Sequence, residues 1–210
     1  EGSVLIKVGN THVLCTATVD EGVPGWMKGT GAGWVTAEYA MLPRSTHTRT
    51  KREREKVGGR THEIQRLIAR ALRACVDLKQ LGERQIIVDC DVLQADGGTR
   101  CASITGGCVA LGIAMKKLIS EGKVPATAWM DTVSAISVGM HNGKVIVDLD
   151  YEKDSTCEVD MNFVRMGKGG FVEVQGTGER ATFSTEQLNE MLIAATKALD
   201  QIKKIQESAV

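Results

Sequence analysis

The sequence predicts an α+β fold in which helices pack on mixed β-sheets. Three observations support this prediction. Short β-branched runs occur in pairs around Gly9-Asn10 and Asn142-Gly143, which are dipeptides typical of hairpin turns. An apolar strand at 85–93 passes through two glycines into a long apolar helix, and the chain ends in an amphipathic helix. No linker or repeat divides the 210 residues, so we expect one domain spanning 1–210.

The composition is that of an ordinary globular protein. Hydrophobic residues make up 42% and charged residues 25%, and the net charge is zero. No uninterrupted apolar run approaches the roughly 20 residues of a membrane span, so we expect no membrane partner. The six cysteines form no Cys-x-x-Cys pair, which favours free thiols and a cytoplasmic location. Because the chain begins within a predicted strand at Glu1, we expect a natural segment before it.

The first half of the chain alternates strands with helices. A helix capped by Thr61 is expected to carry its apolar stripe as far as Leu78, with Gly82 just past its end. The next helix starts near Thr99 or Ser103 and runs toward Gly122. Strands are predicted at 3–8, 11–19, 34–42 and 85–93.

Residues 44–59 form a segment that we call the basic arm. Between Arg44 and Arg60 there are seven basic and two acidic residues, a local balance of +5. The arm has almost no apolar residue, so we expect it to be mobile without a partner. Its arginines favour contact with a nucleic-acid backbone, while a solvated charged loop is the alternative. The candidate RNA-binding residues are Arg44, Arg49, Arg52 and Arg54.

The turn Asp96-Gly97-Gly98-Thr99-Arg100 is a candidate anion site. Two glycines allow backbone N–H groups to approach a ligand at the positive end of a helix. Arg100 adds a planar fork that matches phosphate oxygens, and Thr99 adds a hydroxyl group. If both helices start on one edge of the sheet, Arg60 supplies a second fork. A plain turn with an N-cap is the alternative interpretation.

The second half of the chain is richer in strands and acidic residues. Six acidic residues and one lysine between Asp148 and Asp160 give a local balance of −5. Asp154 and Asp160 flank a short turn into a strand and suit a hard cation such as Mg²⁺, although acidic turns are also common without metal. Ser184 or Thr185 should cap the last helix. Strands are predicted at 129–140, 144–150, 157–165 and 171–175.

Three segments together resemble the signature segments of the ribonuclease PH family. They are Gly58-Gly59-Arg60-Thr61-His62-Glu63-Ile64-Gln65-Arg66-Leu67-Ile68, Gln94-Ala95-Asp96-Gly97-Gly98-Thr99-Arg100 and Asp148-Leu149-Asp150-Tyr151-Glu152-Lys153-Asp154-Ser155. The similarity covers essentially the whole chain, in order. It implies the ribonuclease PH fold, with a left-handed βαβα core (the ribosomal-protein-like domain), as in polynucleotide phosphorylase and exosome ring subunits.

The resemblance also implies an activity, a tRNA nucleotidyltransferase that trims the 3′ end of precursor tRNA with inorganic phosphate as co-substrate. Other RNA 3′ ends and rRNA are further implied substrates, and the implied assembly is a hexameric ring, a trimer of dimers. Matched by motif, the phosphate-binding residues are Arg60, Gly98, Thr99 and Arg100. Asp154 and Asp160 match the family's metal-binding carboxylates, for Mg²⁺ or alternatively Mn²⁺, and the arm matches the tRNA-holding loop.

The residues and the resemblance predict the same chemistry. Phosphate held by Arg60, Thr99 and Arg100 would attack the last internucleotide phosphorus, with charge stabilised by a cation on Asp154 and Asp160. Arg60, Arg100, Asp154 and Asp160 are therefore the predicted catalytic residues. A metal-dependent hydrolytic nuclease and a non-catalytic RNA-binding ring subunit are the two rival functions.

Overall fold

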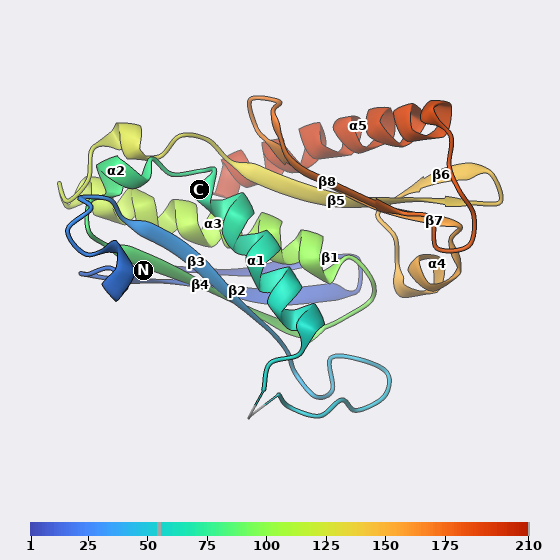
Figure 1. Cartoon of the computed structure of the whole chain (residues 1–210), viewed down its shortest axis with the longest axis horizontal. Helices are drawn as coiled ribbons and strands as arrows, with labels where there is room; N and C mark the ends of the chain where they lie inside the picture. The colour runs from blue at the N-terminus through green and yellow to red at the C-terminus, as the bar shows by residue number, and fades with distance from the viewer. Residues whose placement is uncertain (54–55, 210) are drawn as a thin grey trace.

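The computed structural model describes residues 1–53 and 56–209, and its strands form two four-stranded sheets (Figure 1). The first sheet contains, in spatial order, β1 (Gly2–Val8), β2 (Thr11–Asp20), β4 (Gln85–Gln94) and β3 (Trp34–Met41). The second contains β6 (Lys144–Val147), β5 (Val133–His141), β7 (Val159–Met166) and β8 (Phe171–Thr177). The first sheet is mixed, because β3 runs parallel to β4, and the second is antiparallel throughout.

Three long helices build the layers around these sheets. They are α1 (Gly59–Arg73), α3 (Thr99–Ser120) and α5 (Thr185–Ala209). α1 and α3 touch each other and pack on the first sheet, and α3 also contacts β5 of the second sheet. α5 lies along the other side of the second sheet (Figure 1). The predicted α+β class is therefore confirmed, with its strands divided between two sheets.

Strand β5 shows why the layers hold together. Val133 and Ala135 belong to the core around α1, α3 and the first sheet, whereas Ile136 and Val138 belong to the core beneath α5. Because alternate residues of a strand point to opposite faces, one strand serves both cores. This explains why β5 is buried along almost its whole length rather than on alternate residues.

Helix α3 lies between the two sheets and is apolar on nearly all sides. By length and composition alone it could cross a membrane, but 78% of its most apolar window is buried inside the protein. Such burial is typical of a core helix. Gly106 brings α3 close to the first sheet, since a Cβ there would lie 2.7 Å from Cγ2 of Ile6.

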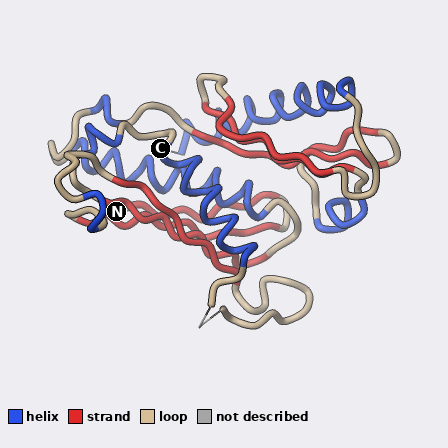
Figure 2. Tube along the Cα trace, in the orientation of Figure 1, coloured by secondary structure: helices blue, strands red, loops and turns tan. Residues whose placement is uncertain are grey.

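The parallel pairing of β3 with β4 determines where the helices begin. The arm and α1 follow β3, and the glycine turn and α3 follow β4, so both helices start at the same edge of the first sheet. This confirms the expected arrangement of the two helix starts. Figure 2 shows the described parts of the arm as loop extending from that edge.

Helix α1 differs from its prediction at both ends. It begins at Gly59 after an extended Gly58, so Thr61 is not its N-cap and Arg60 lies inside the first turn. It ends at Arg73. Asp77 then accepts hydrogen bonds from two backbone N–H groups and caps a separate short helix, α2 (Leu78–Leu81), which has Gly82 at its C-cap.

Two predictions in the second half were wrong in detail. The strand expected from Trp129 begins at Val133, because residues 129 and 130 pair with the segment after α1 instead. Trp129 bridges Val76, and the N–H of Met130 donates to the carbonyl oxygen of Cys75. The short turn expected between Asp154 and the next strand is part of a helix, α4 (Tyr151–Thr156), which Asp150 caps. Two 3₁₀ turns complete the elements, at Gly25–Met27 and Ala126–Ala128.

Candidate active site

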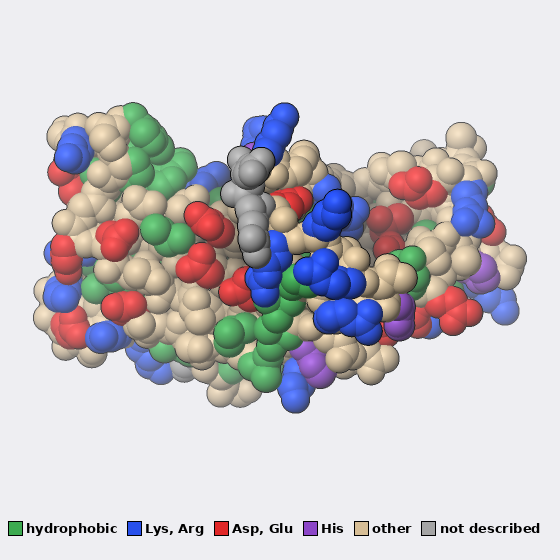
Figure 3. Space-filling view, turned by 90° about the horizontal axis from the view of Figure 1, so that it is seen from below, with side chains coloured by type: hydrophobic (Ala, Val, Ile, Leu, Met, Phe, Trp, Pro, Cys, Tyr) green, Lys and Arg blue, Asp and Glu red, His purple; other side chains and the backbone are tan. Residues whose placement is uncertain are grey.

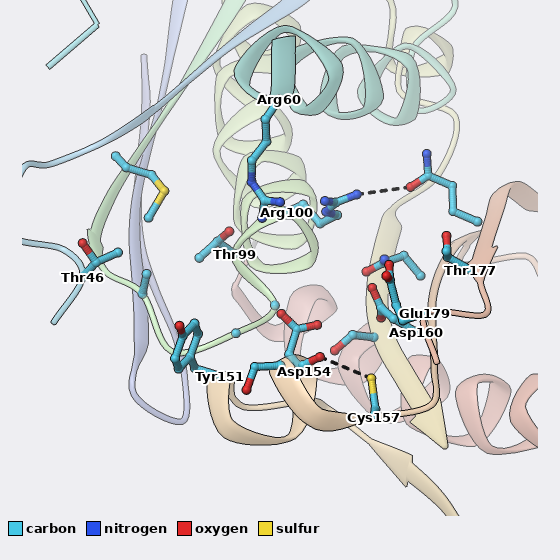
Figure 4. A pocket seen from close by; sticks show the side chains of 18 of the residues that line it. Thr46, Arg60, Thr99, Arg100, Tyr151, Asp154, Cys157, Asp160, Thr177 and Glu179 are labelled. Atoms are coloured by element: carbon cyan, nitrogen blue, oxygen red, sulfur yellow. Dashed lines mark hydrogen bonds between the residues drawn. The ribbon is translucent and has the colours of Figure 1, made fainter. Parts of the chain in front are cut away.

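A cleft of about 1220 Å³ lies between the start of α3 and the acidic end of the second sheet (Figure 4). It brings together all six residues predicted to bind phosphate or metal: Arg60, Gly98, Thr99, Arg100, Asp154 and Asp160. Arg44, Arg49 and Arg52 do not line it and are exposed on the arm. Arg54 lies outside the described residues.

The phosphate side of the cleft is built on the first turn of α3. Gly98 adopts a left-handed conformation at the N-cap, and no side chain caps the helix, so first-turn N–H groups are available to a ligand. The Thr99 hydroxyl lies 2.9 Å from the hydroxyl of Tyr39, a buried residue on β3. Burial raises the pKa of Tyr39, so its hydroxyl keeps its proton at neutral pH.

Two guanidinium groups point into the cleft (Figure 4). The Nη1 of Arg100 donates to Oε1 of Gln175 at 3.3 Å and to Oε1 of Glu63 at 3.4 Å. Both bonds are long, so Arg100 is oriented but weakly held. Within the described residues Arg60 makes no hydrogen bond or ion pair, and its side chain is exposed.

Gly97 joins the phosphate side to the acidic side. Its φ of +76° is left-handed, and a Cβ there would lie 2.2 Å from the carbonyl oxygen of Leu149. Asp96 strengthens the same junction, because its Oδ1 accepts a hydrogen bond from the N–H of Tyr151 at 3.2 Å. Its Oδ2 accepts a second hydrogen bond from Nδ2 of Asn10 at 3.0 Å. The glycine turn is thus fixed directly against the start of α4.

The acidic side consists of Asp154 on α4 and Asp160 on β7. Burial raises the pKa of Asp160 to about 6, the negative charge of Asp154 adds to the effect, and Arg100 opposes it. Loss of hydration likewise raises the pKa of the Asp154 carboxyl, while Arg60 and Arg100 lower it. Glu179, which also lines the cleft, raises both.

The acidic pair fits a hard divalent cation. Oδ1 of Asp160 is buried without a hydrogen-bond partner in the described structure, and carboxylate oxygens are the ligands that Mg²⁺ prefers. The described residues contain no cluster of three or more His, Cys, Asp or Glu able to hold a metal. Asp154 and Asp160 could therefore supply two ligands, and water or phosphate oxygens the others, which is the usual arrangement for Mg²⁺.

Sequence reasoning missed several residues of the cleft. Arg180 lines it and donates to the carbonyl oxygen of Ser155 at 2.8 Å, which ties the loop after β8 to α4. Tyr39, Glu63 and Gln175 support the phosphate side. Only Tyr39 carried a usable signal, since it sits on the apolar face of a predicted strand; the others are ordinary surface residue types.

Comparison with known proteins identifies the family. Residues 1–117 match the model of the 3′ exoribonuclease family, domain 1, and residues 131–198 match the 3′ exoribonuclease family, domain 2. The chain belongs to the 3′ exoribonuclease family. A ribonuclease PH from Bdellovibrio bacteriovorus is 57% identical to this exoribonuclease over 202 residues, which cover 96% of this chain and 83% of that protein.

Solved structures support the fold of this exoribonuclease. An Archaeoglobus fulgidus exosome with RNA bound to the active site is similar with a TM-score of 0.78 at 19% identity, covering 97% of this chain and 82% of that chain. Rice (Oryza sativa) Rrp46 is similar with a TM-score of 0.72 at 17% identity, covering 98% and 91%. The expected ribonuclease PH fold is confirmed.

Membership also confirms the predicted activity. This exoribonuclease is a phosphorolytic 3′-to-5′ enzyme of the nucleotidyltransferase class that acts in tRNA processing. It uses phosphate rather than water to cleave RNA.

Proposed function

We propose that the cleft holds inorganic phosphate on one side and the RNA 3′ end on the other. Arg60, Arg100, the Thr99 hydroxyl and the first N–H groups of α3 bind the phosphate. An oxygen of this phosphate attacks the last internucleotide phosphorus as the bond to the 3′ oxygen of the shortened RNA breaks. The products are a nucleoside diphosphate and an RNA one nucleotide shorter.

Catalysis in this scheme is positioning and charge neutralisation. Phosphate and the phosphodiester are both anionic, so bringing them together requires cations that face both groups. Arg60 and Arg100 extend into the cleft from different helices, so separate cationic groups are available for the two anionic groups (Figure 4). The Arg100 guanidinium can release its long bonds to Glu63 and Gln175 as phosphate arrives.

We assign the cation site to Asp154 and Asp160, for Mg²⁺ or alternatively Mn²⁺. The bound cation would supply charge stabilisation at the reacting phosphorus and the departing oxygen. Oδ1 of Asp160 is available to bind the cation, because it is buried and has no hydrogen-bond partner in the described structure. Their mutual repulsion also favours a bound cation.

The substrates we propose are precursor tRNA and other RNA 3′ ends, including rRNA. Lys and Arg side chains gather on the face that carries the arm, beside a hollow with acidic side chains (Figure 3). Arg44, Arg49 and Arg52 are exposed there and would hold the RNA backbone. Arg54, outside the described residues, belongs to the same predicted group.

We also propose that residues 1–210 act as a single domain, because the cleft needs both sheets. A hexameric ring, built as a trimer of dimers, is the assembly we expect from the resemblance to the ribonuclease PH family, and the similarity of the fold to an archaeal exosome core supports it. All six cysteines are free and buried, which suits a cytoplasmic location.

One observation supports this function most directly: the groups that we assign to phosphate and those that we assign to the cation line one cleft and meet across Gly97. The test is incubation with Mg²⁺ and an RNA carrying extra 3′ nucleotides, with and without inorganic phosphate. We expect nucleoside diphosphates, and only when phosphate is present. Monophosphates released without phosphate would support a hydrolase, and RNA binding without any release would support a binding subunit.

The arm is tested separately by salt dependence. Neutralising Arg49 and Arg52 should weaken tRNA binding and reduce the slope of log affinity against log salt by roughly 0.7 to 0.9 for each lost contact. The matched control replaces Lys197 and Lys204, two exposed lysines on α5, and should leave the slope unchanged. Equal slopes in the wild type and both variants would show that the arm is a solvated loop that does not contact the RNA backbone.

A further inference from the structure

Two aromatic rings stand at the edge of the cleft, His47 on the arm and Tyr151 on α4. Their centroids are 6.1 Å apart and their planes cross at 61°, an edge-to-face contact. They are the aromatic residues among the described residues that line the cleft. Tyr151 is 58% exposed, so the face of its ring is accessible to a ligand in the cleft.

Both rings are held in place by their backbones. Arg44 donates to the carbonyl oxygen of His47 at 3.0 Å, and the preceding Ser45 is buried, with its N–H bonded to the carbonyl of Leu42. These contacts fold the arm into a turn at this point, while its mobility without a partner stays a prediction. On the other side, Asp96 accepts the N–H of Tyr151. The glycine turn and the arm thus hold the two rings in place before any RNA binds.

The chemistry of the rings favours stacking over polar recognition. Within the described residues neither the Tyr151 hydroxyl nor the His47 imidazole makes a hydrogen bond. Tyr151 lies one helical turn before Asp154, so its ring sits beside the carboxylate assigned to the cation. A nucleotide whose phosphate reaches that carboxylate would place its base within reach of Tyr151.

We propose that Tyr151, supported by His47, is a stacking site for the base of one of the last two RNA nucleotides. This inference rests on the proposed function, because it requires the RNA 3′ end in the cleft. Every base has a π-face, so stacking holds the end without selecting its sequence. That property suits an enzyme that must remove successive and different nucleotides.

The test uses short RNAs with 2-aminopurine at the last or the next-to-last position, mixed with protein in phosphate-free buffer. Stacking on Tyr151 should quench the fluorescence at one position. We expect Tyr151→Ala and Tyr151→Leu to lose the quenching and to bind these RNAs roughly 10-fold more weakly, with Tyr151→Phe close to wild type. In turnover assays the same two variants should raise KM for RNA and leave KM for phosphate unchanged.

The matched control is Trp26→Ala, which removes an aromatic side chain that is 65% exposed and outside the cleft. It should keep the quenching and the affinity. Unchanged quenching in Tyr151→Ala, or an equal loss in Tyr151→Phe, would overturn the stacking site. Failure of the wild type to release nucleoside diphosphates would instead defeat the proposed function, because the fluorescence assay requires no turnover.

Discussion

The two sides of the cleft are built in different ways. Thr99 and Arg100 begin a helix of 22 residues that is buried between two sheets, so the core fixes their position. Asp154 lies on a helix of six residues with no buried residue, next to a strand that carries Asp160. The phosphate side is thus positioned by the core, whereas the acidic side depends on local contacts.

The phosphate side and the acidic side of the cleft also differ in their electrostatics. The phosphate side presents guanidinium groups and helix N–H groups, which are ready for an anion without further change. The acidic side has two carboxylates whose pKa values are raised by burial, and for Asp160 also by its neighbour Asp154. Under the proposed function it is complete only when a cation is bound. The contrast teaches that folding preorganises one side, whereas we expect the other side to be ordered by its ligand.

The largest expected effect comes from breaking the phosphate side. Arg100→Ala removes a charged fork facing the nucleophile and should lower kcat/KM roughly 10²- to 10³-fold, because charge-stabilising donors contribute that much in other active sites. The fold should remain, since the side chain makes only long polar contacts. Arg66→Ala, at an exposed position of α1 outside the cleft, is the control. Wild-type turnover in Arg100→Ala would remove Arg100 from the site.

Breaking the junction between the sides should have the next largest effect. Gly97→Ala places a Cβ 2.2 Å from the Leu149 carbonyl oxygen, so α4 must move away from the turn. A shift of about 1 Å can cost roughly 100-fold in rate. Gly98→Ala is the comparison, because its φ is also positive but its nearest atom is 3.8 Å away. We expect thermal melting to show Gly97→Ala as the less stable variant. Equal stability and activity in Gly97→Ala and Gly98→Ala would show that the close contact between Gly97 and Leu149 does not position the two sides of the cleft.

The acidic side should respond to pH. With a pKa of about 6, Asp160 is protonated below that pH, and the proton competes with the cation. Affinity for Mg²⁺, measured by calorimetry, should fall about 10-fold per unit as pH drops below 6 and level off above it. Without metal, protein stability should depend on pH in the opposite direction. The folded state binds this proton more tightly than the unfolded state, so stability should fall as pH rises from about 4 to about 6. Asp160→Asn should weaken both dependences, and the part that remains should come from Asp154, whose pKa burial also raises.

Local chemistry made the phosphate side predictable from the sequence. The glycine turn, the strand before it and the helix after it are all encoded within one segment. The parallel order of β3 and β4 followed from a strand–helix repeat and placed Arg60 correctly. The start of α1 was missed because Gly58 and Gly59 carry no side-chain cap, and its end because the capping role of Asp77 was overlooked.

The acidic side was less predictable because it depends on contacts between distant segments. Asp150 offered a local capping signal for α4, but nothing in the sequence shows Gly97 meeting Leu149. Arg180 reaches the carbonyl oxygen of Ser155 from the loop after β8, across 25 positions of the chain. The phosphate side has long-range contacts of the same kind, since the bond between Tyr39 and Thr99 links residues 60 positions apart and Gln175 on β8 reaches Arg100 on α3. Pairings of this kind are determined by the packing of the two sheets and not by spacing along the chain.

The smallest expected effect sharpens how the core supports the phosphate side. In Tyr39→Phe the Thr99 hydroxyl loses its 2.9 Å partner and is free to rotate. One hydrogen bond contributes about 1 kcal/mol, so KM for phosphate should rise roughly 5-fold with kcat little changed. A double-mutant cycle with Thr99→Val separates orientation from packing. If Tyr39 acts through Thr99, its effect should vanish in the Thr99→Val background, because the hydroxyl it orients is gone. Additive effects would show that Tyr39 serves the fold alone.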